Sequence, residues 1–241
     1  MKKRKEYKNK FLKVFLFFAF ILILLGFLNL IPTFFGLGFG WIVLYFAGFF
    51  YFLLEGKPYR KAYEFFKKLR WFFLFSVGIF ILFAVVGLIF PIFFTEEIIS
   101  LLSRITISIE GKSLCELIIF IFSNNARSAI TAFILGIGLG IFPLFILVLN
   151  GYVLGFVGNK VIMQQGLLAF WKILPHGIFE LFAVFLATGI GIKIGTNQIF
   201  KHEKINLSYN YREGLRFFIF VIIPLLLIAA IIEGLLIMFV N

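Results

Sequence analysis

The sequence predicts an all-α membrane protein, a polytopic bundle of about seven transmembrane helices with its N-terminus inside. The first observation is composition: 62% of residues are hydrophobic, mean hydropathy is +1.09 and only 14% are charged. Soluble domains carry about 25% charged residues, and a chain of 241 residues could not hide so much apolar surface from water. The second is the presence of long apolar runs, and the third is the clustering of basic residues beside them.

Six apolar runs approach or exceed the roughly 20 residues that a helix needs to cross the hydrocarbon core. They are 11–31, 34–54, 71–94, 128–149, 176–195 and 217–240. The first two are joined by little more than Pro32 and Thr33, so 1–54 is predicted to form an N-terminal two-helix membrane hairpin. The remainder, 55–241, is predicted to be a five-span membrane core.

The segment 152–170 is ambiguous, because its apolar ends enclose Asn159, Lys160, Gln164 and Gln165. A lysine within a span costs at least about 2.5 kcal/mol on insertion scales, so the segment is either a shielded crossing or re-entrant. Cytoplasmic loops are enriched in Lys and Arg. Residues 1–13 carry seven of them and 55–70 carry six. If 196–216 is also inside, 152–170 must cross, which gives seven spans; a re-entrant segment gives six.

The segment 95–127 is predicted to lie on the outer side of the membrane. Apolar residues recur there at helical spacing, as at Ile98, Leu102 and Ile105, which is typical of a helix lying in the membrane interface. The apolar stretch 114–122 is too short to span and is expected to dip into the membrane or pack on the bundle.

Small residues concentrate in the second half of the chain at spacings that let helix backbones approach closely in lipid. The candidate helix-packing positions are Gly136, Gly140, Gly151, Gly155, Gly177, Gly191 and Gly195. Two interpretations stay open: packing inside one chain, or an interface between copies. The second predicts a homo-oligomer.

Polar residues beside and within the apolar runs are the candidate site. His176 and Glu180 are four residues apart and share a helix face. Asn124 and Asn125 precede a predicted span and suit helix capping, and Asn150 belongs to an Asn-Gly turn signature. We predict that all five converge in one polar cluster near the outer face. Glu233 lies deep in the last run and needs a partner, which the sequence does not identify.

Several function classes are disfavoured. The net charge of +12 would suit a nucleic-acid binder, but the basic residues flank apolar runs, where they suit anionic headgroups. The single Cys115 excludes an internal disulfide and a multi-cysteine metal cluster. His176 and Glu180 fall short of the three protein ligands of a catalytic zinc site. With no catalytic motif recognisable, we expect no enzyme activity, no cofactor and no metal.

Four motifs occur in a characteristic order: F-S-N-N-A-R-S-A at 122–129, G-I-G-L-G-I-F-P at 136–143, L-N-G-Y-V-L-G at 149–155 and L-P-H-G-I-F-E at 174–180. Together they resemble the stage II sporulation protein M family of integral membrane proteins over roughly residues 71–240. The resemblance implies a core of about five spans. In spore-forming bacteria the family member is a membrane partner of peptidoglycan-remodelling proteins, but the family also occurs in organisms that form no spores.

Two functions compete. The first is a non-enzymatic scaffold or partner-recruiting component of a membrane or cell-envelope assembly, in which 95–127 positions other proteins. The second is a transporter or channel whose path uses the polar groups around His176 and Glu180. Both place a multi-pass protein in the cell membrane, with the lipid bilayer, copies of itself and other membrane or envelope proteins as its partners, and with no nucleic acid.

Overall fold

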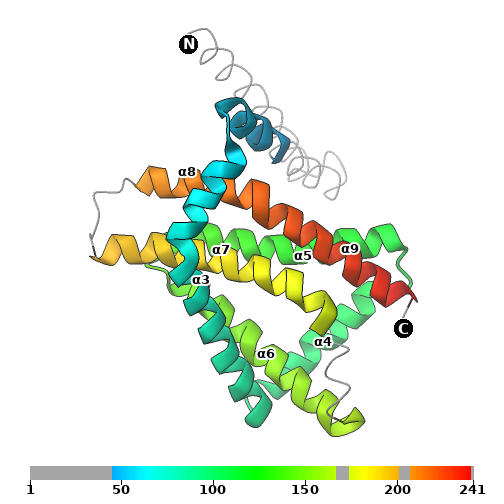
Figure 1. Cartoon of the computed structure of the whole chain (residues 1–241). Coiled ribbons are helices and arrows are strands. Elements are labelled where there is room, and N and C mark those ends of the chain that lie inside the picture. Colours follow the sequence, from blue (N-terminus) through cyan, green and yellow to red (C-terminus); the bar gives the residue numbers. More distant parts are fainter. Residues whose placement is uncertain (1–44, 167–173, 201–206, 240–241) are drawn as a thin grey trace, which may run out of the picture.

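The computed structural model describes residues 45–166, 174–200 and 207–239, and their regular structure is entirely helical (Figure 1). The helices are Tyr45–Glu55, α3 (Pro58–Ile89), α4 (Thr95–Ile109), α5 (Leu114–Ile134), α6 (Ile141–Gln165), α7 (Leu174–Phe200), α8 (Leu207–Phe217) and α9 (Ile223–Phe239). A 3₁₀ turn, η1 (Leu135–Ile137), continues α5, and a π-helix, η3 (Phe218–Ile222), joins α8 to α9. The predicted hairpin 1–54 lies outside the described residues except for its last part.

Five segments are long and apolar enough to cross a membrane. They are Pro58–Ile89, Leu114–Ile137, Ile141–Gln165, Gly177–Gln198 and Leu207–Phe239. Residues 55–241 therefore do contain five candidate spans, but the boundaries of two differ from those predicted.

The predicted span 128–149 is wrong. Its residues are divided between the end of α5 and the start of α6, with a break at 138–140. Leu139 and Gly140 have positive φ values of 57° and 77° there. A right-handed helix requires negative φ, so this backbone interrupts the helix, and glycine adopts it most freely. Pro143 occupies the third position of α6, where its missing N–H leaves no helical bond unmade.

Several other predictions around this break are corrected. Residues 114–122 are the first half of α5, whose N-cap is Ser113 in a capping box with Glu116. Asn124 and Asn125 therefore lie in mid-helix and cap nothing. Likewise, Asn150 makes no turn: its amide donates to the Ile146 carbonyl 2.7 Å away within a continuous α6.

The segment 152–170 is not a separate crossing, since 152–165 form the second half of α6. Lys160 is exposed near the end of this helix, with its Nζ 5.4 Å from the centroid of the Phe156 ring. A side chain so placed can reach the interface with its ammonium group while its stem stays in apolar surroundings. This position reduces the insertion cost that made the segment ambiguous.

Helices α3 and α6 run in parallel and touch through their backbones. A Cβ atom on Gly151 would lie 2.6 Å from the Phe80 carbonyl oxygen, and one on Gly155 would lie 1.9 Å from that of Ala84. From the other side, a Cβ on Gly87 would lie 2.2 Å from the Tyr152 carbonyl oxygen. No residue larger than glycine fits these three positions unless the helices separate.

Helix α7 is the most enclosed span, with 67% of its membrane window buried against 17% for α3. A Cβ on Gly191 would meet the Ala132 carbonyl oxygen at 2.3 Å, and one on Gly195 would meet the Gly140 nitrogen at 2.0 Å. Gly136 in turn faces the Gly191 backbone. These faces are filled by the chain itself, which supports the first interpretation, packing inside one chain, for these glycines.

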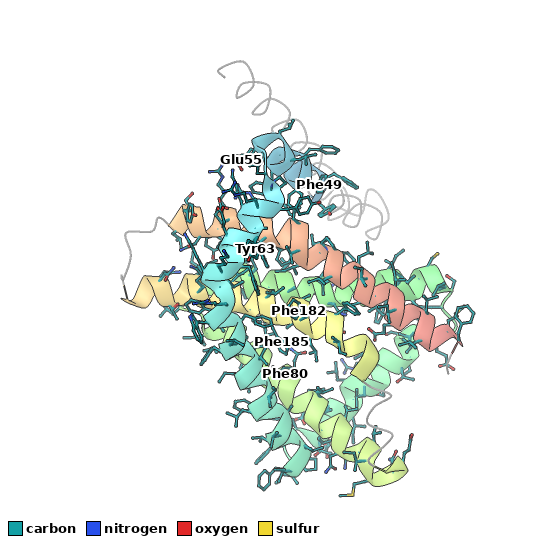
Figure 2. The ribbon with its side chains drawn as sticks, in the orientation of Figure 1. Phe49, Glu55, Tyr63, Phe80, Phe182 and Phe185 are labelled. Carbon is teal, nitrogen blue, oxygen red and sulfur yellow. The ribbon has the colours of Figure 1, made fainter. Side chains whose placement is uncertain are left out.

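Aromatic rings fill the space between α3 and α7. Phe73 meets Phe182 edge-on with centroids 5.0 Å apart. Phe80 meets Phe185 in the same way at 5.0 Å, and Figure 2 labels both rings. Edge-to-face pairs contribute about 0.5–1.5 kcal/mol beyond their buried area. These ring contacts hold α7 against α3.

We expect Gly155→Ala to destabilise the protein by several kcal/mol, because its methyl group would overlap the Ala84 carbonyl. Gly78→Ala on α3 is the matched control, since nothing lies within 4 Å of a Cβ there, and it should be neutral or stabilising by about 0.5–1 kcal/mol. Unfolding in mixed micelles measures both. Equal stabilities of the two variants would contradict the parallel α3–α6 contact.

Candidate functional site

A buried polar cluster lies where α5, α7 and α9 run side by side (Figure 1). The side chain of Asn125 on α5 is 7% exposed and hydrogen-bonds to the carboxylate of Glu180 on α7. The carboxylate of Glu233 on α9 faces Glu180 closely enough to interact with its charge. The three side chains come from three different spans and meet inside the bundle.

Only part of the predicted cluster is brought together. Asn124 is exposed, and its amide lies 3.5 Å from the Asn125 oxygen at the margin of the cluster. Asn150 is exposed on α6 and its amide bonds to Ile146 within the same helix, so the prediction that it joins the cluster is wrong. His176 belongs to the first turn of α7, and its side chain lies outside the described residues.

Glu233 is the member that the predicted cluster omitted. Its need for a partner was evident from the apolar run around it, but the sequence did not identify Glu180, 53 positions away, as that partner. Its Oε2 atom is buried and has no hydrogen-bond partner among the described residues. Glu180 and Glu233 thus form a pair of carboxylates in an apolar bundle, with one amide donor between α5 and α7.

The chemistry open to this cluster is limited. The amide of Asn125 can donate to one carboxylate, and two neighbouring carboxylates repel each other when both are charged. Among the described residues, no group of three His, Cys, Asp or Glu side chains is placed to hold a metal ion. The cluster is suited to join α5 to α7 through a hydrogen bond, and it is also suited to hold a proton on one of its two carboxylates.

We expect Glu180→Ala to cost about 1–3 kcal/mol, because it leaves the buried Asn125 amide without its acceptor. Glu180→Gln keeps an acceptor oxygen and should retain most of the stability. Glu97→Ala, at an exposed position of α4, is the control and should change little. Denaturation in micelles provides the comparison; a Gln variant as unstable as the Ala variant would show that the carboxylate itself is required.

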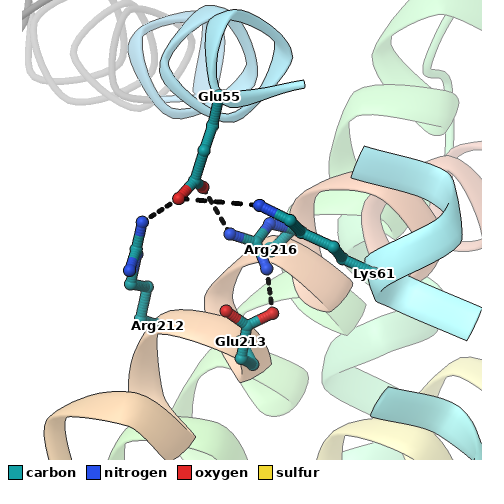
Figure 3. Close-up of polar contacts among 5 residues, drawn as sticks. All are labelled: Glu55, Lys61, Arg212, Glu213 and Arg216. Carbon is teal, nitrogen blue, oxygen red and sulfur yellow. Dashed lines mark hydrogen bonds and ion pairs between the residues drawn. The ribbon is translucent and has the colours of Figure 1, made fainter. Parts of the chain in front are cut away.

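A second polar site, an ion network, joins the helix Tyr45–Glu55 to α3 and α8 (Figure 3). Glu55 ends the helix Tyr45–Glu55 and accepts hydrogen bonds from Arg212 and Arg216 of α8. The ammonium group of Lys61 lies 3.7 Å from Glu55 Oε1. Arg216 also donates to Glu213, one turn earlier in α8. This network connects the helix before the core to α3 and α8.

Arg216 is the centre of the ion network. Its side chain is 1% exposed, and its guanidinium lies 4.8 Å from the centroid of the Phe52 ring. A buried guanidinium is tolerated only when carboxylates and further hydrogen bonds compensate its lost hydration. Glu55 and Glu213 supply the charges, and Phe52 covers the guanidinium.

The π-helix η3 begins two residues after Arg216. Its residues Ile219 and Phe220 pack against Phe52, and Phe220 stacks on Phe49 with centroids 4.9 Å apart. Figure 2 shows Phe49 and Glu55 together on the helix above the core. Apolar packing and the ion network therefore hold the same helix.

Glu55 lies outside the five candidate spans. Its partial burial by itself raises its pKa, but the hydrogen bond from Arg216 and the charges of Arg216, Arg212 and Lys61 outweigh burial and hold the pKa below its usual range. The carboxylate is thus ionised at neutral pH. Its contribution to stability is complete above the ordinary value of 4.5 and is lost as pH falls through the lowered pKa.

The ion network escaped prediction because its signal is weak in the sequence. Glu55 is the single acidic residue between an apolar run and a basic segment, and Arg216 borders the last apolar run. Each looks like an ordinary charge flanking a membrane span. Only the fold brings two residues 161 positions apart into contact.

We predict that Glu55→Gln loosens the helix Tyr45–Glu55 from the core, because one charge partner of a buried arginine is lost; breaking such pairs costs about 3–5 kcal/mol. Glu64→Gln is the control, since its pair with Arg60 is exposed and is worth less than about 1 kcal/mol. Amide exchange over 45–55 is the measurement. Because the intrinsic exchange rate itself falls with pH, protection factors are compared: those of the wild type should fall as pH is lowered below 4.5, and those of Glu55→Gln should lack that change.

Five apolar helices, with a polar cluster of Asn125, Glu180 and Glu233 where three of them meet, define a polytopic α-helical membrane protein. The chain belongs to the stage II sporulation protein M family, which it matches over residues 71–236. The resemblance carried by the four sequence motifs is thereby confirmed. The match begins within α3, so it leaves out the helix Tyr45–Glu55 that supplies Glu55.

Among curated proteins, the chain is similar to an uncharacterized protein of Methanocaldococcus jannaschii. The two are 33% identical over 131 residues, which cover 49% of this chain and 54% of the relative. The chain therefore spans about half the length of the curated relative it matches. No solved structure matches the chain.

Proposed function

We propose that the protein is a non-enzymatic scaffold of a membrane or cell-envelope assembly, and that α4 is the element that positions partner proteins. The observation that carries this proposal is the exposure of α4. Of its fifteen residues only Ile98 is buried, while Ile99, Leu101 and Ile107 are 53%, 48% and 72% exposed. This helix adds little to the core and presents its side chains outward.

The position of α4 is nevertheless fixed. The hydroxyl of Tyr152 on α6 accepts from the Phe93 N–H at 2.9 Å and donates to the Phe90 carbonyl at 2.9 Å. Ile98 then packs on Tyr152 and Phe156. A helix that is anchored at its start and exposed along its length is suited to present a constant surface to another molecule.

The packing inside the bundle favours a rigid scaffold over a transport pathway. Backbones touch at Gly151, Gly155 and Gly191, and Glu180 is engaged by Asn125. Transport requires polar groups that line a route open to water and can change their contacts. The pair of carboxylates, Glu180 and Glu233, is the feature that favours a transporter, so the experiment also measures proton flux.

The test places a photo-crosslinking amino acid at Ile107 on α4. The control places it at Ile81 on α3, also an exposed isoleucine, which is 55% exposed and lies within a span. After irradiation in cells and purification in mild detergent, we expect protein adducts at 107 and lipid adducts at 81. Absence of protein adducts at 107 would contradict the scaffold. Proton flux in reconstituted vesicles that Glu180→Gln abolishes would support the transporter instead.

A further inference from the structure

A surface pocket of about 250 Å³ opens between the beginnings of α3 and α8, beside the ion network. Pockets for drug-sized ligands hold roughly 300–1,000 Å³, so this one suits a smaller group. Its walls combine two lysines, two carboxylates and two aromatic rings. These residues are Lys61, Glu64, Phe65, Lys68, Tyr209 and Glu213.

The carboxylates in the wall are already neutralised by arginines outside it. Glu64 accepts a hydrogen bond from Arg60 Nε at 3.1 Å, and Glu213 accepts one from Arg216. An anion in the pocket would therefore meet the two lysines without facing an uncompensated negative charge. Lys61 Nζ is 3.7 Å from Glu55, and its other two N–H groups can serve a ligand.

The surroundings of the pocket add to its attraction for anions. Residues 55–70 carry six Lys or Arg against two Glu, and α8 adds two arginines against Glu213. The summed field of such a surface concentrates anions near it. The ammonium of Lys68 lies 5.8 Å from the centroid of the Tyr209 ring, so the lysine and the tyrosine line the same wall.

The pocket lies where polar helix surface gives way to apolar span. On α3 its last lining residue is Lys68, three positions before the apolar run that starts at Trp71. On α8 its last lining residue is Glu213, four positions before Phe217. Basic pockets between membrane helices at this level are suited to phosphate-bearing headgroups, and tyrosine is enriched there.

We propose that this pocket binds an anionic phosphate group through Lys68 and Lys61, and that the group belongs to a phospholipid headgroup of the adjoining leaflet. The same chemistry would accept free phosphate from solution. The lipid is the better source because the pocket opens at the ends of membrane helices, where headgroups are concentrated. The inference goes beyond the scaffold function and uses the end of the bundle away from α4.

The test uses the full chain purified in detergent and mixed with phosphatidylglycerol or phosphatidylcholine, with bound lipid counted by native mass spectrometry. We expect retention of phosphatidylglycerol over phosphatidylcholine. Lys68→Gln should lower that retention about fivefold, as loss of one lysine beside an anionic headgroup predicts. Lys67→Gln is the matched control, because Lys67 is outside the pocket lining and its ammonium faces the Tyr63 ring at 4.7 Å.

A third arm adds inorganic phosphate to the protein carrying phosphatidylglycerol. If phosphate displaces the lipid, and only when Lys68 is present, the pocket accepts phosphate from lipid or from solution. If phosphate displaces no lipid, the pocket is specific for the lipid headgroup. Equal losses in the Lys67 and Lys68 variants would overturn the proposal, since they would indicate diffuse attraction to the whole basic surface. Retention of the two lipids to the same extent would overturn it as well. Melting temperature checks that both exposed substitutions leave the fold intact.

Discussion

Backbone contact at glycine is the interaction on which the arrangement of the helices depends. In lipid, apolar side chains gain little by leaving acyl chains for one another, so helices associate through close packing. Here Gly151 and Gly155 bring α6 against α3, and Gly191 and Gly195 bring α7 against α5, η1 and the start of α6. Each contact allows carbonyl oxygens to approach to distances that any side chain would prevent. The two sets of contacts position α3, α5, α6 and α7 in one unit.

That close packing dictates where polar groups can lie. Backbones meet directly at the glycine contacts, and the carboxylates of Glu180 and Glu233 meet at a separate place in the bundle, beside Asn125. The larger ion network around Arg216 lies at the end of the bundle, where Glu55 and Lys61 remain partly exposed. The two polar sites share no residue.

The helix Tyr45–Glu55 is joined to this frame in a different way. It contributes no glycine contact as close as those of α6 and α7 with another backbone; its Gly48 faces the flexible end of the Ile219 side chain. Its attachment uses Phe52, the stacking of Phe49 on Phe220, and Glu55. These are side-chain contacts rather than contacts between backbones. The family match also begins after this helix, at residue 71.

The sequence by itself determined the class of protein, its family and the need of Glu180 for polar partners within an apolar run. Hydropathy and motif spacing are local properties of the chain, so they can be read without the fold. Tertiary structure decided where the helices between 113 and 166 begin and end. The run G-I-G-L-G could be an apolar span or a break, and contact of Gly136, Gly140 and Pro143 with α7 selects the break. It also decided which polar residues meet: Glu180 with Glu233, and Glu55 with Arg216. Periodicity assigns a residue to a face of its own helix, but only packing between helices determines what that face touches.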